Sequence, residues 1–277
     1  MAAAASAVMR CGRTPLNPIH ETFEAGVDLR WRQHAVGGGS LEAAGGTLLL
    51  CSNDARADGY SNAQLDDYQG LMRRRLPWRA PLTLTVRARF SHAAGTLRGT
   101  AGFGFWNDPF LITGRRLPAL PRAVWFFYAS PPSNMQLDTL APGHGWKAAT
   151  IDASRAAFLA LAPSAPIALP LMRLPPLRRA LWPIAQAAMG VREAAIGADM
   201  RRWHTYTLRW LRDGAQFAVD GETVLSSKLA PRGQLGFVIW LDNQYAVVTP
   251  QGALGGGLLA IGGRQWLEVD EIHIRGG

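Results

Sequence analysis

Residues 203–224 read W-H-T-Y-T-L-R-W-L-R-D-G-A-Q-F-A-V-D-G-E-T-V, and this stretch predicts a β-hairpin. Large apolar or aromatic side chains alternate with polar ones along His204–Trp210, which is the period of a strand with one buried face. Asp213-Gly214 supplies a turn, because glycine tolerates the positive φ of tight hairpins, and Asp220-Gly221 turns the chain again. The hairpin indicates a β-sheet scaffold and identifies no ligand.

Other segments carry similar strand patterns, and turn residues separate them, including the glycine run Gly255–Gly257. The predicted strands are Phe23–Arg32, Leu48–Ser52, Leu82–Phe90, Gly99–Trp106, Ala123–Ala129, Trp203–Leu211, Gln216–Val219, Gly233–Leu241 and Trp266–Ile274. Many short strands with such turns favour an all-β fold, an antiparallel β-sandwich of the jelly-roll type. A chain of 277 residues fits one large β domain.

The domain organisation predicted from these patterns is a flexible N-terminal lead, residues 1–20, followed by a single jelly-roll domain, residues 21–277. A partly helical insertion rich in Ala, Leu, Pro and Arg, residues 141–202, interrupts that domain. Prolines break its uncharged part, Ala156–Met172, whereas Leu177–Val191 has the apolar spacing of an amphipathic helix. Insertions of this length are usually lids or binding elements, so we expect a lid.

The hairpin motif H-T-Y-x-L-x-W, a turn and F-x-V-D-G-E resembles the concanavalin A-like lectin/glucanase superfamily. The laminarinase-like family 16 glycoside hydrolases are the nearest comparison. The opening residues Phe23–Trp31 and the closing strand Trp266–Ile274 resemble the same domains. This resemblance implies a two-sheet jelly roll with a ligand cleft on its concave sheet.

The catalytic motif of family 16 is missing from the strand that should carry it. Retaining enzymes of this family place two carboxyl groups about 5–5.5 Å apart on one cleft strand, in a pattern like E-x-D-x-x-E. The matching strand looks like Ala123–Ser130, which contains no acid. The family's catalytic residues are therefore not carried over, and Asp108 with Asp242 form the alternative catalytic pair.

Two strands end alike, in G-F-G-F-W-N-D and in G-F-V-I-W-L-D-N-Q-Y. Glycines beside a tryptophan leave room for a ligand to approach the sheet. The alternative is that these are core tryptophans followed by turn residues. The predicted ligand-binding residues are Trp106, Asn107, Trp125, Tyr128, Asn134, Asp138, Trp240, Asn243 and Tyr245.

Cofactor predictions are limited to one metal ion. The superfamily resemblance implies a structural calcium ion near the first and last strands, with Asp270 as a ligand and Glu24 or Gly46 beside it. Carboxylate and carbonyl oxygens suit that ion. The alternative is that Asp270 is solvated or hydrogen-bonded, and no other cofactor motif stands in the sequence.

Two functions are predicted from the cleft. The first is a carbohydrate-active or carbohydrate-binding protein that lacks the family 16 acids. The alternative is an enzyme or carrier for an apolar or amphipathic small molecule, such as a lipid, terpenoid or aromatic compound, enclosed by the 141–202 lid. If the chain is an enzyme, Asp108 and Asp242 would serve a glycoside hydrolase or an acid/base cyclase or isomerase.

The charge balance bears on other partners. The formal net charge is +9, from 29 basic and 20 acidic residues, and no nucleic-acid-binding spacing accompanies it, so no specific nucleic-acid ligand is predicted. A third hypothesis is contact of the insertion with an anionic membrane surface through Arg178, Arg179 and Arg192. The N-terminal sequence lacks a signal-peptide pattern, which predicts a cytoplasmic protein. Oligomeric state and pairing of Cys11 with Cys51 stay open.

Overall fold

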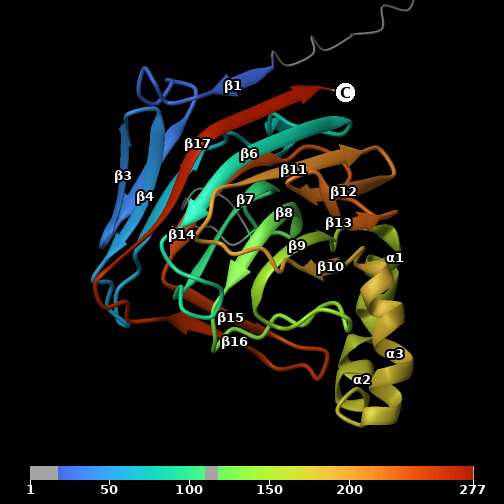
Figure 1. Cartoon of the computed structure of the whole chain (residues 1–277). Helices are drawn as coiled ribbons and strands as arrows, with labels where there is room; N and C mark the ends of the chain where they lie inside the picture. Colours follow the sequence, from blue (N-terminus) through green and yellow to red (C-terminus); the bar gives the residue numbers. More distant parts are fainter. Residues whose placement is uncertain (1–17, 110–117, 277) are drawn as a thin grey trace, which may run out of the picture.

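Two β-sheets packed face to face form the body of the protein, as the computed structural model shows for residues 18–109 and 118–276 (Figure 1). Sheet A has the strand order β13-β12-β11-β6-β17-β4-β3, with β1 paired to β17, and sheet B has the order β10-β9-β8-β7-β14-β5-β2. A separate hairpin is formed by β15 and β16. Within the described residues, all pairs among these strands are antiparallel, so the predicted antiparallel sandwich is confirmed.

The strands and helices have the following bounds. The strands of sheet A are β1 Ile19–Glu21, β3 Gly39–Ala44, β4 Thr47–Asn53, β6 Leu82–Phe90, β11 His204–Leu211, β12 Gly214–Val219, β13 Glu222–Ser227 and β17 Arg264–Gly276. Those of sheet B are β2 Arg32–Val36, β5 Asn62–Asp66, β7 Thr100–Trp106, β8 Arg122–Ala129, β9 Gly145–Asp152, β10 Arg192–Ala195 and β14 Gly236–Asp242. The hairpin strands are β15 Gln244–Val248 and β16 Leu254–Leu258. The helices are η1 Arg73–Arg75, α1 Ala156–Leu161, η2 Ala162–Ser164, α2 Ala165–Leu171 and α3 Pro175–Ala188.

The predicted hairpin is present as β11, β12 and β13. Val219 pairs with Glu222, and the intervening Asp220 and Gly221 both have positive φ, 50° and 84°, as a tight hairpin turn with right-handed twist requires. The first turn lies one residue earlier than predicted, because Gly214 already pairs with Leu211. The strand alternation of this segment was therefore sufficient to identify the hairpin.

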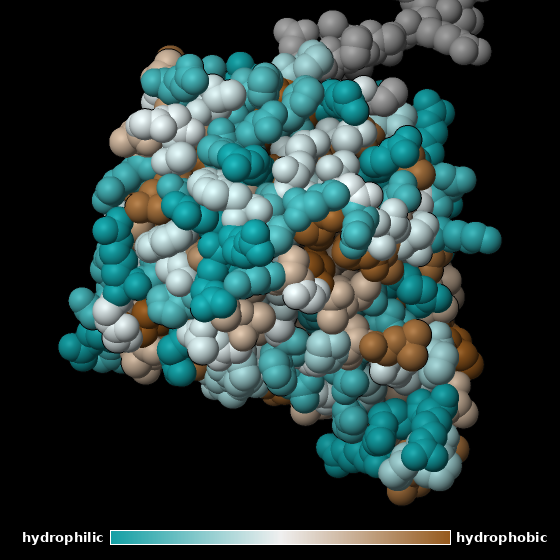
Figure 2. Space-filling view, in the orientation of Figure 1, coloured by the Kyte–Doolittle hydropathy of each residue, from teal (hydrophilic) through white to brown (hydrophobic). Residues whose placement is uncertain are grey.

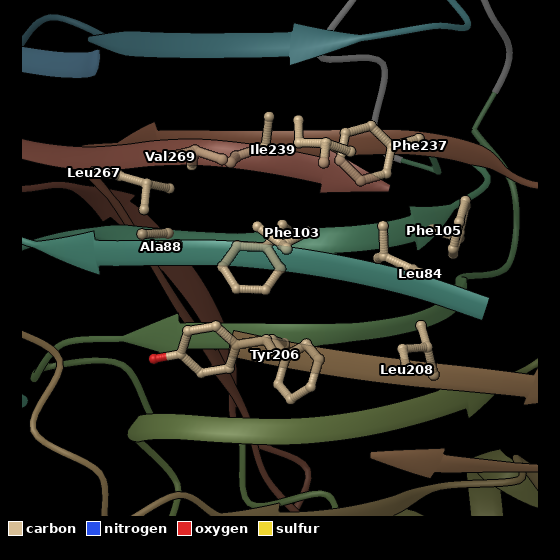
Figure 3. Close-up of a cluster of buried hydrophobic side chains, with 14 of the residues drawn as sticks. Leu84, Ala88, Phe103, Phe105, Tyr206, Leu208, Phe237, Ile239, Leu267 and Val269 are labelled. Atoms are coloured by element: carbon tan, nitrogen blue, oxygen red, sulfur yellow. The ribbon is translucent and has the colours of Figure 1, made fainter. Parts of the chain in front are cut away.

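The core lies between the sheets and is built from alternate residues of their strands. Sheet B contributes Phe103, Phe105, Phe237 and Ile239, and these rings and aliphatic groups pack against sheet A side chains (Figure 3). The sheet A residues labelled there are Leu84, Ala88, Tyr206, Leu208, Leu267 and Val269. Since strand side chains alternate between faces, the other residues of β7, β8 and β14 must point away from sheet A. We call that surface the open face of sheet B.

Three sequence predictions need correction. The segment Phe23–Arg32 forms bends and turns, because Phe23 adopts a φ of 59° that an extended strand does not allow, although its ring is buried. The run Gly255–Gly257 is part of β16, where its lack of side chains accommodates the ring of Tyr245. The segment 141–202 includes β9 and β10 of sheet B, and its helices span 156–188.

The two ends of the chain are described only in part. Most of the predicted lead, residues 1–20, falls outside the described residues, and Ile19 already belongs to β1. Cys11 also lies outside them, so its pairing with the buried Cys51 stays untested. Within the described residues, no helix has the length and apolar character needed to cross a bilayer.

Candidate functional site

A cavity of about 680 Å³ lies on the open face of sheet B. Its walls come from β7, β8, β9 and β14, from the β15–β16 hairpin, and from Phe158 of α1 with Met189 after α3. Most of the lining side chains that the structure describes are apolar or aromatic. A volume of this size suits a small-molecule ligand, since such sites usually span about 300–1,000 Å³.

Four aromatic side chains from three neighbouring strands line this cavity: Trp106, Trp125, Phe127 and Trp240. The ring centroids of Trp125 and Trp240 lie 5.2 Å apart, and those of Trp125 and Phe127 also lie 5.2 Å apart. The planes of Trp106 and Trp240 are inclined by only 7°. We call these four residues the aromatic floor.

Two glycines of β7 make room for the aromatic floor. Gly102 pairs with Phe127 and Trp240, and Gly104 pairs with Trp125. A Cβ at Gly102 would lie 2.9 Å from the Cη2 atom of Trp240, and a Cβ at Gly104 would lie 2.6 Å from the Cα of Trp125. Strand glycines often mark such close approaches. The glycines that precede Trp106 in β7 are therefore explained by the rings of β8 and β14 that pack over them.

Asp242 supplies a carboxyl group at the cavity wall, at the end of β14. Its Oδ1 atom accepts hydrogen bonds from the Thr100 hydroxyl at 2.8 Å, the Thr100 N–H at 3.2 Å and the Gln244 N–H at 3.0 Å. The Trp240 Nε1–H donates to the same Thr100 hydroxyl at 2.9 Å. Burial raises the pKa of Asp242 from 3.8 to about 6, despite these hydrogen bonds. This carboxyl group can therefore take up or release a proton near neutral pH.

A buried ion pair lies at another part of the wall. The Lys147 ammonium is fully buried and donates to Oε2 of Glu193 at 3.0 Å and to the carbonyls of Met135 and Pro142 at 3.3 and 3.2 Å. Burial raises the pKa of Glu193, while the neighbouring ammonium acts in the opposite direction. Because the ammonium and the carboxylate neutralise each other, Glu193 contributes a polar group to the cavity wall that carries little unpaired negative charge.

The structure brings together five of the predicted site residues. Trp106, Trp125, Trp240, Asp242 and Tyr245 all line the cavity. They come from β7, β8, β14 and β15, so the ends of strands far apart in the sequence do meet at one site.

Tyr128 is placed on the wrong face by the sequence prediction. Its side chain is buried in the core, and its hydroxyl donates to the Leu97 carbonyl at 2.7 Å and accepts from the Gly95 N–H at 3.0 Å. Alternation along β8 explains the error, because Trp125 and Phe127 point to the cavity whereas Val124, Phe126 and Tyr128 point to sheet A.

The four other predicted ligand-binding residues serve the backbone or lie outside the described lining. Asn107 accepts from the Arg122 N–H and donates to the Leu120 carbonyl. Asn243 accepts from the Ser61 N–H and donates to three carbonyl groups. Asp138 accepts from the backbone N–H groups of Leu140 and Glu193, and Asn134 is exposed. The side chains of Asn107, Asn243 and Asp138 therefore bond to the backbone and hold loops in place, and none of the four residues is among the described residues that line the cavity.

Asp108 does not share the cavity with Asp242. It is fully buried with a φ of 47°, two residues after the end of β7, and it is not among the described residues that line the cavity. The pKa of Tyr60 is raised by burial and also by Asp242 and Asp108, so both carboxylates lie within electrostatic range of that phenol. The two aspartates do not form a pair facing one ligand.

The predicted calcium ligands are not clustered. Asp270 forms an ion pair with Arg87, and Glu24 is exposed. Across residues 18–109 and 118–276, no group of three or more His, Cys, Asp or Glu side chains is arranged to hold a metal ion. Arg87 contacts only the Oδ2 atom of Asp270, and Oδ1 is buried without a hydrogen-bond partner, so calcium binding at Asp270 stays a prediction.

Sequence reasoning missed several lining residues. Glu193, Gln244 and the strand glycines of β16 all contribute to the cavity. Glu193 lies on β10, a four-residue strand without a clear alternation signal, and its role depends on Lys147, which is 46 residues away in the chain. The glycines of β16 resemble a turn, so only strand pairing reveals their position.

Comparisons with known proteins support the fold. No family model and no curated protein matches the sequence. Among solved structures, an endo-acting O-glycanase of the human gut microbiota has a TM-score of 0.50 and 10% identity, covering 94% of this chain and 98% of that chain. An endo-β-galactosidase from Clostridium perfringens that releases GlcNAcα1-4Gal also has a TM-score of 0.50 and 10% identity, covering 92% and 61% of the two chains.

The fold shared with the O-glycanase and the endo-β-galactosidase is an antiparallel two-sheet jelly roll. This confirms the predicted resemblance to concanavalin A-like and family 16 proteins at the level of architecture. A β-glucanase from Bacillus licheniformis is also similar, with a TM-score of 0.47, 10% identity and coverage of 94% and 98%. At such identities the fold alone is shared, so function must be argued from the site.

Proposed function

We propose that this glucanase-like jelly roll binds an apolar or amphipathic small molecule in the cavity on the open face of sheet B. The observation that carries the proposal is the lining of β8. Its side chains on the cavity side are Ala123, Trp125 and Phe127, on the strand where the family 16 resemblance calls for carboxylates. This apolar lining supports binding by hydrophobic burial and argues against a double displacement.

The polar groups of the cavity set the orientation of the ligand. Among the described lining residues, the carboxyl groups are Asp242 and Glu193, and Glu193 is already paired with Lys147. Thr100 and Gln244 donate three hydrogen bonds to the Oδ1 atom of Asp242. We assign Asp242 to recognition of one hydroxyl or amine group on an otherwise apolar ligand, because a single polar contact in an apolar pocket fixes orientation.

A carbohydrate is the second candidate ligand, favoured by the aromatic floor. Sugar rings have apolar faces that stack on indole, and the similar jelly rolls named above act on glycans. However, each buried sugar hydroxyl needs a hydrogen-bond partner, and leaving one unmade costs about 1–3 kcal/mol. The mostly apolar lining therefore favours the first candidate.

The test is a ligand search on the full chain. Organic extracts of the purified protein are analysed by mass spectrometry, and thermal shifts are then measured with fatty acids, terpenoids and polycyclic aromatics, and with β-glucan, xylan and galactan oligosaccharides. We expect stabilisation by a member of the apolar set. Stabilisation by oligosaccharides alone would transfer the site to the carbohydrate candidate, and stabilisation by neither set would remove both.

Trp125→Ala provides a variant of the site, and Trp203→Ala provides its control. Trp203 directly precedes β11 of sheet A and lies beside Arg87 and Arg89, whose guanidinium carbons are 4.8 and 4.9 Å from its ring centroid. We expect Trp125→Ala to weaken ligand binding at least about ten-fold, since burying an aromatic side chain contributes about 1.5–3 kcal/mol. Trp203→Ala should bind normally. Equal losses in both variants would contradict the assignment of the aromatic floor.

A further inference from the structure

The helical segment, residues 156–188, has one face that is anchored to the protein. Trp182 and Met172 are buried there, and the Trp182 Nε1–H donates to the Leu137 carbonyl at 3.0 Å. The same buried cluster includes Met189 and Val191, and Ile151 packs against it. The segment is therefore held on the body of the protein by its inner face, which leaves the outer face to be explained.

The outer face of the helical segment exposes aliphatic side chains. Of the fourteen large apolar residues that are exposed in the described chain, seven belong to this segment: Leu159, Ile167, Leu169, Leu171, Leu174, Leu177 and Ile184. Ile167 is 70% exposed, and Leu174 and Ile184 are each 55% exposed. Apolar side chains gathered in this way on a surface commonly mark an interaction site.

The charges of the segment all have one sign. Residues 156–188 contain no Asp or Glu, and their charged residues are Arg173, Arg178 and Arg179. In Figure 2, apolar side chains lie beside strongly hydrophilic ones over the helices at the lower right. Aliphatic groups combined with arginines and without acids are typical of helices that lie in the interface of an anionic bilayer.

The position of the segment gives this surface a connection with the cavity. Figure 1 shows α1, α2 and α3 projecting at one end of the sandwich, near the β15–β16 hairpin. At the hairpin tip, a Cβ at Gly252 would lie 3.8 Å from a methyl group of Leu169, and Leu254 is 78% exposed. Phe158 of α1 lines the cavity itself. The helical segment therefore carries the exposed apolar side chains and also contributes Phe158 to the cavity wall.

We propose that the outer face of the helical segment docks on the surface of an anionic lipid bilayer. The aliphatic side chains enter the headgroup region, and Arg173, Arg178 and Arg179 contact lipid phosphates. A second copy of the chain fits less well, because a symmetric pair would bring two sets of these arginines together with no acidic partner from either segment. The proposal goes beyond ligand binding in the cavity and does not depend on it.

The experiment is co-sedimentation of the full chain with vesicles. One set contains phosphatidylcholine mixed with phosphatidylglycerol, and the other contains phosphatidylcholine alone, each at low and high salt. We expect strong binding to the anionic set, weaker binding at high salt because the arginine attraction is screened, and little binding to the neutral set. Size-exclusion chromatography with light scattering is run on the same samples.

Two variants separate the apolar and ionic contributions. Replacing Arg173, Arg178 and Arg179 with glutamine should lower the partition coefficient on the order of 100-fold, since each basic residue near an anionic surface contributes about a five-fold effect. The double variant Ile167→Asp with Ile184→Asp should lower it by at least about ten-fold. Both sets of positions are on an exposed segment, so folding is checked by an unchanged thermal transition.

The matched controls carry equivalent changes elsewhere. The double change Leu29→Asp with Leu211→Asp alters two leucines outside the segment that are 92% and 40% exposed, and glutamine at Arg202, Arg209 and Arg212 removes three exposed charges around β11. We expect both controls to bind anionic vesicles nearly as well as the unmodified chain. The proposal is overturned if the unmodified chain ignores anionic vesicles, or if controls and test variants lose binding equally. Self-association that the Ile167 and Ile184 changes abolish, without vesicle binding, would also overturn it and assign the face to a second copy.

Discussion

Replacing Asp242 by asparagine should stabilise the protein at neutral pH. Burial raises the pKa of Asp242 from 3.8 to about 6 in the folded state, so the separation of roughly 2 corresponds to a penalty of about 3 kcal/mol once the group is ionised. The asparagine Oδ1 atom can still accept hydrogen bonds from Thr100 and Gln244 while carrying no charge. The variant therefore avoids the penalty and keeps the local geometry.

The sign of the pH dependence follows from the raised pKa. Below the unfolded-state value both states hold the proton, and no penalty exists. As pH rises towards the folded-state value, the unfolded chain ionises first, so the unmodified protein loses stability relative to Asp242→Asn. From about pH 4.5 to about pH 7.5, the free energy of unfolding of the variant minus that of the unmodified chain should rise by about 2 kcal/mol.

Urea unfolding followed by tryptophan fluorescence at a series of pH values measures this difference. The control is Asp199→Asn, because a hydrogen bond from Arg201 lowers the pKa of Asp199 to about 2. A lowered pKa means that the ionised Asp199 stabilises the folded state, so the Asp199→Asn variant should be less stable than the unmodified chain at neutral pH. This loss of stability should shrink as pH falls through the acid range. If the Asp242→Asn difference stays constant or decreases as pH rises, the reasoning on burial is refuted.

Two further predictions concern packing and the buried ion pair. Gly104→Ala should cost about 2 kcal/mol or more of stability and weaken ligand binding, because its Cβ would lie 2.6 Å from the Trp125 Cα. The control Gly59→Ala, whose Cβ would have no atom within 4 Å, should be tolerated, and equal thermal stability of the two variants would contradict this prediction. Glu193→Gln should lower the free energy of unfolding by about 3 kcal/mol or more, because it leaves the Lys147 ammonium buried without its counter-charge. The double variant Lys147→Met with Glu193→Leu should recover much of that stability, as measured by chemical denaturation. Additive losses in that double variant would show that the two charges do not act as a pair.

The cavity shows where sequence reasoning on the site succeeds and where it stops. The sequence identifies Trp106 and Trp240 because each lies near the end of a strand that carries glycine on the same face, a pattern that is local in the chain. Asn107 and Asn243 follow the same strands and look equally suited to a ligand, yet their amide groups bond to backbone groups of loops distant in sequence. Partners so far along the chain leave no local pattern.

Tyr128 shows a second limit. The strand β8 is aromatic on both faces, so its alternation indicates that Trp125 and Tyr128 point in opposite directions but not which one meets the other sheet. Only the packing of sheet A against sheet B decides this, because it places Phe126 and Tyr128 in the core. The family resemblance implied a concave cleft strand at this position but not the parity of its residues.

By itself, the sequence determined the jelly-roll scaffold, the hairpin at Trp203–Val224 and the proline-broken helical segment. These depend on local periodicity, turn chemistry and residue identity, which a linear chain carries directly. The tertiary structure alone decided which side chains share the cavity, how far burial raises the pKa of Asp242, and that the helical segment exposes its aliphatic groups. Each of these depends on which strands become neighbours and on the water they exclude, and distant parts of the chain set both.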